Sequence, residues 1–309
     1  MILIDDKLNE KISESIYVAL GSFDGMHKGH LLLIDKILNL ANKNNGKSMV
    51  YTFKNHPLTI INKNKAPKIL LDNKTKEEVL GNLGVDILCL KEFDEKLMKL
   101  SPEAFIENLV HEFNIKGIVV GFNYRFGYKN KGDLELLKTL SKKFDFELYI
   151  KEAYTIENEI VSSTRIRELI SLGEIKKANE MLGREYVLRG EVVEGRRLGR
   201  TIGFPTANLK PLTNILIPKI GVYYTNVEVG GKIYKGITSV GNNPTVNGKN
   251  ITIETNILDF NKDIYNNNIK VYFLDRIRDE KKFSSLDELK IQLEKDKKFA
   301  KNQSEKIIL

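Results

Sequence analysis

Two of the four histidines in the sequence, His27 and His30, lie three residues apart in the glycine-rich segment GSFDGMHKGH. The apolar run IYVAL precedes this segment, and LLLIDKILNL, which has the spacing of an amphipathic helix, follows it. A turn between a strand and a helix presents unpaired backbone N–H groups and the positive end of the helix dipole, which favour a bound phosphate. The pattern therefore indicates phosphoryl or nucleotidyl transfer, in which donors positioned around phosphate oxygens lower the barrier.

A metal site is the main alternative for this pair of histidines. A zinc ion would need a third protein ligand, and beyond the pair the sequence offers Cys89, His56 and His111 as nitrogen or sulfur ligands. We interpret Cys89 as a buried, inert thiol and His111 as a solvated residue late in a helix. His56 is either a structural histidine or one near a nucleotide. The phosphate interpretation is therefore favoured.

A second group of candidate residues lies in GRTIGFPTANL, residues 199–209. The hydroxyl of Thr206 and the amide oxygen of Asn208 are hard ligands of the kind that Mg²⁺ accepts together with nucleotide phosphates and water. For this stretch taken alone, a turn held by local side-chain hydrogen bonds is the alternative.

Up to residue 152, β-rich runs alternate with helical patterns. The strand patterns are IYVAL, SMVYTF, VDILCL, IKGIVVG and FELYIKE, and the helical patterns between them include LLLIDKILNLANK and SPEAFIENLVHEF. This alternation predicts a parallel sheet with helices on both faces. Two short helices, TRIRELISLG and EIKKANEMLG, each end in glycine and are expected to close this part of the chain.

From Tyr186 onward the pattern changes to strands and tight turns. Two alternating runs, GVYYTNVEV and KIYKGITSV, flank Gly230 and Gly231 and predict a two-residue hairpin. Several such strands in succession indicate an antiparallel β-barrel, and LDELKIQLEKDKKFA predicts a final amphipathic helix. We therefore expect two domains, residues 1–183 and residues 184–309.

The charge balance suggests an anionic partner, because 49 Lys and Arg residues against 41 Asp and Glu residues give a net charge of +8. Many lysines stand among asparagines, as in ANKNNGK, which is typical of solvated loops and weakens a nucleic-acid interpretation. No run is long and apolar enough for a membrane span, and the start lacks a signal-peptide pattern. The single cysteine excludes an internal disulfide, so we expect a cytoplasmic protein.

GSFDGMHKGH has the form of the HxGH motif and resembles its version in the bacterial bifunctional riboflavin kinase/FMN adenylyltransferases, the FAD synthetases. YTFKNHP, LSPEAFIENLV, IVVGFNYRFGYKNKGD and VSSTRIRELI follow that family in its order. In the second half, GFPTANL is similar to the family's riboflavin kinase signature, and IPKIGVYYT, SVGNNPTV and ETNILDF follow it. The resemblance implies an α/β Rossmann-like nucleotidyltransferase domain, then an antiparallel riboflavin kinase barrel with a C-terminal helix.

For the first domain the resemblance implies an ATP site and a flavin site. His27 and His30 would stabilise the transition state. Asn123 would contact the nucleotide or the flavin, and Phe126 would contact the flavin. The other residues implied for ATP binding are Gly21, Phe23, Asp24, Gly25, Ser163, Thr164 and Arg167. Taken alone, SSTRIR is also a good N-cap run, and the rings of GFNYRFG could equally belong to the core.

For the second domain the resemblance implies that Thr206 and Asn208 bind Mg-ATP. Glu254 would be the base that accepts the proton of the ribityl hydroxyl, and an exposed strand charge is the alternative for it. Arg278 and Glu280 would lie near the flavin. Mg²⁺ is the expected metal and ATP the co-substrate, with riboflavin, FMN and FAD as further ligands and neither nucleic acid nor a membrane as a partner.

The expected enzyme phosphorylates riboflavin in its second half and adenylylates FMN in its first. Small departures from the family, such as Asn55 in place of proline and Met26 in place of valine, remove no functional group. Two alternatives stay open. Only one half could be active, or the chain could be a basic nucleic-acid-binding protein on a nucleotide-binding scaffold, for which steep salt dependence is expected.

Overall fold

The computed structural model describes residues 1–5, 12–195, 199, 202–245 and 248–303. Arg200 and Thr201 of GRTIGFPTANL and Val246 of SVGNNPTV lie outside the described residues. The chain divides into two compact units, the first made of residues 1–69 and 73–162 and the second of residues 70–72 and 163–309.

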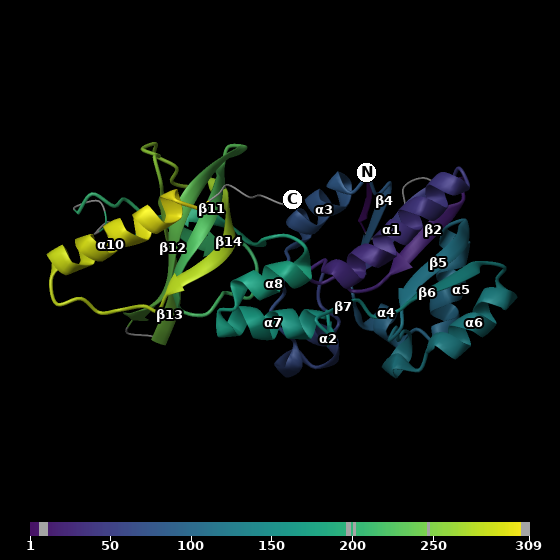
Figure 1. Cartoon of the computed structure of the whole chain (residues 1–309). Helices are drawn as coiled ribbons and strands as arrows, with labels where there is room; N and C mark the ends of the chain where they lie inside the picture. The colour runs from purple at the N-terminus through teal and green to yellow at the C-terminus, as the bar shows by residue number, and fades with distance from the viewer. Residues whose placement is uncertain (6–11, 196–198, 200–201, 246–247, 304–309) are drawn as a thin grey trace. The chain divides into compact units, whose positions relative to one another are not determined.

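The first unit is built on a six-stranded parallel sheet with the order β1-β4-β3-β2-β5-β6 (Figure 1). The strands are β1 (Ile2–Asp5), β2 (Ile16–Leu20), β3 (Lys47–Phe53), β4 (Ile87–Lys91), β5 (Ile115–Gly121) and β6 (Glu147–Lys151). The helices are α1 (Lys28–Lys43), α2 (Leu58–Ile61), η1 (Lys63–Lys65), α3 (Asn73–Asn82), α4 (Glu95–Lys99), α5 (Pro102–Glu112), η2 (Tyr128–Asn130) and α6 (Leu134–Lys143). A small hairpin, β7 (Thr155–Ile156) and β8 (Glu159–Ile160), follows. The predicted parallel sheet is confirmed.

Strand β2 lies inside this sheet and is buried along its whole length. Its residues Val18 and Leu20 belong to a core cluster with side chains of α5 and α6. Helix α1 packs against β2, β3 and β5, and its buried side chains, Ile34 and Ile37 among them, are not part of that cluster. Successive β2 side chains therefore point to opposite faces of the sheet and pack against helices on both of them.

The chain moves away from β2 in two directions, through β3 and β4 on one side and through β5 and β6 on the other. The strand order therefore reverses between β2 and β5. In open α/β sheets, ligands bind beyond the carboxyl ends of the strands at such a reversal. The GSFDGMHKGH segment follows β2 and Asn123 follows β5, so both begin at this point.

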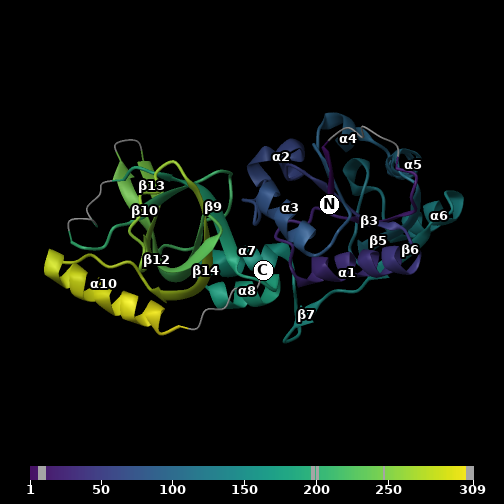
Figure 2. The same ribbon diagram turned by 90° about the horizontal axis from the view of Figure 1, so that it is seen from above.

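The second unit is a closed antiparallel barrel, which Figure 2 shows from above. Its strand order is β10-β13-β12-β11-β14-β9. The strands are β9 (Tyr186–Val193), β10 (Ala207–Pro211), β11 (Gly221–Val229), β12 (Lys232–Thr245), β13 (Gly248–Ile257) and β14 (Asn268–Arg278). The predicted hairpin is confirmed: β11 and β12 pair from Val229 and Lys232 outward, and Gly230 and Gly231 have φ values of 55° and 77°. Both φ values are ones that glycine adopts without a steric cost.

Two short helices, α7 (Ser163–Leu172) and α8 (Ile175–Leu182), belong to the compact unit of the barrel. Asn179 on α8 donates a hydrogen bond from Nδ2 to the backbone oxygen of Phe273 on β14, and its Oδ1 accepts one from the N–H of Tyr186 on β9. The compact units thus divide after Ser162, whereas the sequence places the division after Gly183. A domain boundary after Gly183 stays a prediction, because the division into compact units does not test it.

The predicted C-terminal helix is present as α10 (Leu286–Lys301), which begins with Ser285 as its N-cap. A hydrophobic cluster joins it to the barrel wall, with Ala300 packed near Val222 and Tyr224 of β11. Arg278, the last residue of β14, forms an ion pair with Asp296 of α10, with Nη2 and Oδ2 2.8 Å apart. The helix is therefore anchored to the barrel by apolar contacts and by one buried ion pair.

Candidate functional site

His27 is the N-cap of α1 and lies at the end of the turn that follows β2. Its Nδ1 accepts a hydrogen bond from the backbone N–H of His30 at 3.3 Å, and its backbone oxygen accepts one from the same group at 2.7 Å. The two imidazole rings are stacked, with centroids 3.6 Å apart and planes 18° apart. No acidic residue lies in the first turn of α1, and the pair stands at the N-terminus of this helix, which is the positive end of its dipole.

The turn before these histidines has an uncommon backbone conformation. Phe23 and Met26 have φ values of 45° and 46°, although neither is glycine, and both side chains are fully buried. Gly25 lies between them with a φ of 83°. Thr52 on β3 donates a hydrogen bond from Oγ1 to the backbone oxygen of Ser22 at 2.9 Å. The surrounding core therefore holds the turn in a shape that its residues would otherwise disfavour.

The remaining residues predicted for this turn lie close to the stacked pair. The ring of Phe23 is 5.1 Å from the ring of His30 between centroids. A Cβ atom on Gly21 would come within 3.2 Å of the Phe23 ring, so this glycine allows the ring to fold under the turn. Asp24 is buried, with 6% of its surface exposed. The structure therefore places the Phe23 ring beside His30 and Gly21 beside the Phe23 ring, and Asp24 is buried in the same turn.

The two residues predicted for the flavin lie beyond β5. Asn123 is exposed, whereas Phe126 is 5% exposed and belongs to the core cluster. Phe126 is one of a row of six rings in ring-to-ring contact, here called the aromatic row, which runs Phe93, Phe53, Tyr51, Phe105, Phe126, Tyr124. Burial raises the pKa of the Tyr124 phenol. Phe126 and Tyr124 of GFNYRFG thus belong to the aromatic row and lie in or against the core cluster, whereas Phe122 is 44% exposed.

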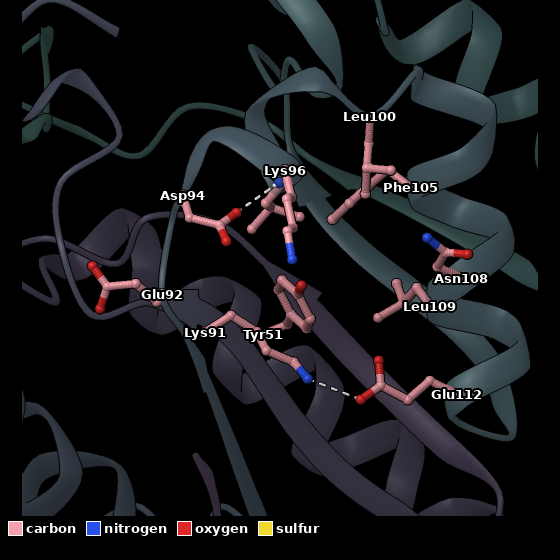
Figure 3. A pocket seen from close by; sticks show the side chains of 11 residues that line it. Tyr51, Lys91, Glu92, Asp94, Lys96, Leu100, Phe105, Asn108, Leu109 and Glu112 are labelled. Carbon is pink, nitrogen blue, oxygen red and sulfur yellow. Dashed lines mark hydrogen bonds and ion pairs between the residues drawn. The ribbon is translucent and has the colours of Figure 1, made fainter. Parts of the chain in front are cut away.

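A pocket of about 260 Å³ lies beside the aromatic row (Figure 3). Tyr51 and Phe105 form part of its apolar wall, and Lys91 and Glu112 form an ion pair at its edge, with N and O 2.9 Å apart. Figure 3 shows the side chain of Lys96 pointing toward the Tyr51 ring. The walls of this pocket come from β3, β4, α4 and α5, which no local motif connects, so the sequence does not predict it.

Ser163, Thr164 and Arg167 lie in the first two turns of α7, on the second unit. Arg165, which stands between them, forms an ion pair with Glu168, with 2.8 Å between Nη1 and Oε2. The role of Ser163, Thr164 and Arg167 in an ATP site stays a prediction.

In the barrel, Thr206 and Asn208 come together with Glu254, which lies 48 positions beyond Thr206 in the sequence. Asn208 on β10 is the cross-strand partner of Glu254 on β13. The hydroxyl of Thr206 donates a hydrogen bond to Oε2 of Glu254 over 3.5 Å. A Cβ on Gly195 would come within 2.1 Å of the Asn208 amide nitrogen, so a glycine there leaves room for that amide.

A pocket of about 370 Å³ opens beside this group and is lined by Thr206 and Asn208. Its other walls combine apolar side chains such as Val192 and Ile257 with the polar segment Asn261, Lys262 and Asp263. One hydroxyl, one amide oxygen and one half-buried carboxylate form a set of hard oxygen donors of the kind that Mg²⁺ prefers. The residues present therefore fit a magnesium-nucleotide.

Arg278 and Glu280, predicted to lie near the flavin, do not line this pocket. The Arg278 guanidinium makes three contacts of 2.8–3.2 Å with the carboxylate of Asp296, which is 2% exposed. The Glu280 carboxylate lies against Gly241, where a Cβ would come within 2.7 Å of Oε1. Arg278 thus anchors α10 in this structure, and its role toward the flavin stays a prediction.

Among the described residues, no three His, Cys, Asp or Glu side chains gather closely enough to hold a metal ion. In the same part of the chain, no helix is both long and apolar enough to cross a membrane.

Two family models match the chain, FAD synthetase over residues 9–165 and riboflavin kinase over residues 182–304. Two similar curated proteins, from Listeria monocytogenes and Bacillus subtilis, are both described as bifunctional riboflavin kinase/FMN adenylyltransferases. The first is 38% identical over 283 residues, which is 90% of this chain and 89% of the relative. The second is 35% identical over 299 residues, which is 95% of this chain and 93% of the relative.

Among solved structures, a crystal structure described as a macrolide-efflux protein from Streptococcus pneumoniae matches with a TM-score of 0.89. It is 38% identical in sequence, and the match covers 98% of this chain and 100% of the other. The fold is therefore shared over nearly the whole length of both chains.

Proposed function

The chain belongs to the bifunctional riboflavin kinase/FMN adenylyltransferases, and on that premise we propose which of its residues carry out each reaction. The enzyme transfers a phosphoryl group from ATP to riboflavin, which gives FMN, and then adenylylates FMN with a second ATP, which gives FAD. The observation that carries the assignment is that each unit gathers its own set of motif residues, the stacked histidines in one and Thr206, Asn208 and Glu254 in the other.

In the barrel, we assign Glu254 as the base of the kinase reaction. The ribityl hydroxyl oxygen forms a bond to the γ-phosphorus of ATP, the bond from that phosphorus to the bridging oxygen breaks, and ADP leaves. The hydroxyl proton passes to the Glu254 carboxylate, which the Thr206 hydroxyl orients from 3.5 Å. Thr206 and Asn208 would hold Mg²⁺, which neutralises charge on the phosphates when it is bound.

In the parallel-sheet unit, we assign the turn and the stacked histidines to the adenylyl transfer. A phosphate oxygen of FMN forms a bond to the α-phosphorus of ATP, the bond to the next bridging oxygen breaks, and pyrophosphate leaves. His27 and His30 stand at the N-terminus of α1, where ring N–H groups, backbone N–H groups and the helix dipole all favour negative charge. Because the stacking and the N-cap hold the rings in place beforehand, little reorganisation is needed at the moment of reaction.

The same proposal assigns the remaining ligand contacts. Gly21, Phe23, Asp24 and Gly25 would shape the turn around the ATP phosphates, and Ser163, Thr164 and Arg167 of the SSTRIR segment would bind the triphosphate. For the flavin of the adenylyl transfer we propose Asn123, Phe126 and the pocket beside the aromatic row. Stacked and edge-on rings of that row are suitable partners for the flat isoalloxazine ring. A cytoplasmic location, consistent with a single buried cysteine, is part of the proposal.

Replacement of one carboxylate tests the kinase assignment. Glu254→Gln keeps the size of the side chain but removes its basicity, so kcat for riboflavin phosphorylation is expected to fall by about 10²–10⁴-fold. FMN adenylylation by the same protein should stay at the wild-type rate. The matched control is Glu191→Gln on β9, which does not line the pocket and should leave both rates unchanged. A Glu254→Gln enzyme with a kinase rate near wild type would remove Glu254 from the mechanism.

A further inference from the structure

The pocket beside the aromatic row has lining residues of two kinds. The apolar kind comprises the ring of Tyr51 and the side chains of Leu97, Leu100, Phe105 and Leu109. The charged kind comprises Lys91, Glu92, Asp94, Lys96 and Glu112. In the view of Figure 3, Leu100, Phe105 and Leu109 lie on the right of the pocket and Asp94 and Lys96 on its left. A flat ligand that is apolar at one end and polar at the other fits this division, because each end can lie against matching side chains.

Apart from one lysine, the charged side chains of this lining are already engaged or point elsewhere. Lys91 and Glu112 form the ion pair at the edge of the pocket, with N and O 2.9 Å apart. Asp94 is the N-cap of α4, and its Oδ1 accepts a hydrogen bond from the N–H of Leu97 at 2.8 Å. Figure 3 shows the carboxylate of Glu92 pointing away from the pocket.

Lys96 is the lysine that remains for a ligand. Its side chain points toward the Tyr51 ring, as Figure 3 shows. Among the residues that the structure describes, no ion pair or hydrogen bond of its ammonium group is found. Lys99, one turn later on the same helix, is instead paired with Glu95, with Nζ and Oε2 2.9 Å apart, and it does not line the pocket. The pocket therefore contains one ammonium group that can donate hydrogen bonds to a bound molecule.

The backbone that carries Lys96 is held in place without a ligand. Asn55, which follows β3, makes two hydrogen bonds with the backbone of Phe93, just before α4. Its Nδ2 donates to the backbone oxygen at 2.9 Å, and its Oδ1 accepts from the N–H at 2.8 Å. The Asp94 cap then fixes the first turn of α4, in which Lys96 lies. Such preorganisation lowers the entropic cost of a contact with a ligand.

The charge of the lining favours a neutral acceptor over a phosphate as the partner of this ammonium. The acids Glu92, Asp94 and Glu112 outnumber the cations Lys91 and Lys96. A phosphate dianion would be repelled by this excess of carboxylates, because like charges that are brought together carry a large energetic cost. A carbonyl oxygen carries only a partial negative charge and accepts a hydrogen bond from an ammonium group. The isoalloxazine ring has its carbonyl oxygens at one edge and two methyl groups at the opposite edge.

We propose that Lys96 is a specificity-determining residue of the adenylyl transfer, and that its ammonium donates a hydrogen bond to a carbonyl oxygen, or to the adjacent ring nitrogen, at the pyrimidine edge of the isoalloxazine. The dimethyl edge then lies against Leu100, Phe105 and Leu109. The inference rests on the proposed use of this pocket for the flavin. It adds the direction in which the ring enters and the residue that selects a ring with acceptors at that edge.

The test measures FMN adenylylation by the full chain, with FMN supplied and KM determined separately for FMN and for ATP. Lys96→Met keeps most of the apolar stem but removes the ammonium, so KM for FMN is expected to rise by about tenfold, which corresponds to about 1.4 kcal/mol. KM for ATP and kcat should change little, because the contact is made equally in the ground state and the transition state. Lys96→Arg keeps a cation and should stay within about threefold of the wild-type KM. The matched control is Lys99→Met, which removes a lysine paired outside the pocket and should leave KM within about twofold.

Lumiflavin identifies the part of FMN that Lys96 contacts, because it has the isoalloxazine ring but neither the ribityl chain nor the phosphate. As an inhibitor competitive with FMN, it should lose affinity in Lys96→Met by the same factor of about ten. An unchanged Ki for lumiflavin together with a raised KM for FMN would place Lys96 at the phosphate and overturn the inference. Lumiflavin that does not compete with FMN in the wild type would overturn it as well.

Three further results would contradict the inference while leaving the proposed function intact. They are a KM for FMN that stays within about twofold in Lys96→Met, a rise in KM for ATP instead, and an equal effect in Lys99→Met. A Lys96→Arg enzyme as impaired as Lys96→Met would show that the positive charge is not what the ligand requires. A wild type that does not adenylylate FMN would overturn the proposed function itself, and the inference with it.

Discussion

Among single residues, His27 and His30 carry the same side chain but have different roles in the structure. His27 caps α1 through its Nδ1, whereas the side chain of His30 is not the cap of the helix. We predict that His30→Ala lowers kcat for FMN adenylylation by about 10²–10³-fold, the range for loss of one oriented transition-state donor, with little change in unfolding free energy. His27→Ala should lose a comparable factor and also about 1 kcal/mol of stability through the cap. Steady-state kinetics and urea unfolding distinguish these results, and equal stability losses in the two variants would contradict them.

Arg278 shows where residue-level inference from sequence is limited. The motif places it near the flavin, but the structure shows its guanidinium bound to the buried carboxylate of Asp296, which a local pattern cannot reveal because the partner lies 18 positions away on another element. By contrast, Thr206, Asn208 and Glu254 were named from sequence and do come together, because neighbouring strands of one barrel carry them.

This ion pair leads to a prediction about stability. Arg278→Met would leave the Asp296 carboxylate buried without its cation, so we expect the barrel to lose about 3–5 kcal/mol of unfolding free energy. The double variant Arg278→Met with Asp296→Leu should recover much of that loss, because both charges are then removed. Chemical unfolding of the three proteins provides the measurement. If Arg278→Met kept its stability but had a raised KM for riboflavin, this prediction would be contradicted and the predicted flavin contact of Arg278 would be supported.

At the scale of elements, the start of α1 is the critical feature, and glycine is required there for steric reasons. A Cβ on Gly29 would come within 3.2 Å of the His27 ring and would press on the stacked pair. Gly29→Ala is therefore expected to reduce FMN adenylylation by about tenfold, even though alanine favours a helix, and to leave the kinase rate unchanged. Gly81→Ala in α3 is the matched control, since nothing lies within 4 Å of the added carbon, and it should raise stability by about 0.5–1 kcal/mol. A fully active Gly29→Ala enzyme would show that the ring stacking is not needed.

Much of the element order was predictable because the signals are local. The alternation of short apolar runs and amphipathic segments predicted the parallel sheet, and the Gly230-Gly231 pair predicted the β11–β12 hairpin. Strand β1 was not predicted, because it has only four residues, lies at the edge of the sheet and is defined by its pairing with β4. The grouping of α7 and α8 with the barrel also depends on tertiary contacts, such as those of Asn179, that no periodicity encodes.

In the whole molecule, the proposed residue roles place two separate reaction centres, which act in succession, on one chain. The stacked histidines and the turn before them belong to the parallel-sheet unit, whereas Thr206, Asn208 and Glu254 belong to the barrel. If the assignments are right, a defect in one centre leaves the other intact, and the intermediate FMN can pass from one chain to another through solution.

The most direct measurement is a complementation assay with His30→Ala and Glu254→Gln chains, in which riboflavin, FMN and FAD are separated by chromatography over time after the addition of ATP and Mg²⁺. Alone, His30→Ala should convert riboflavin to FMN and stop there, and Glu254→Gln should leave riboflavin unchanged but convert supplied FMN to FAD. Mixed in equal amounts, the two variants should produce FAD from riboflavin. FAD formed from riboflavin by either variant alone at the wild-type rate, or no FAD from the mixture, would contradict the assignment of two independent centres.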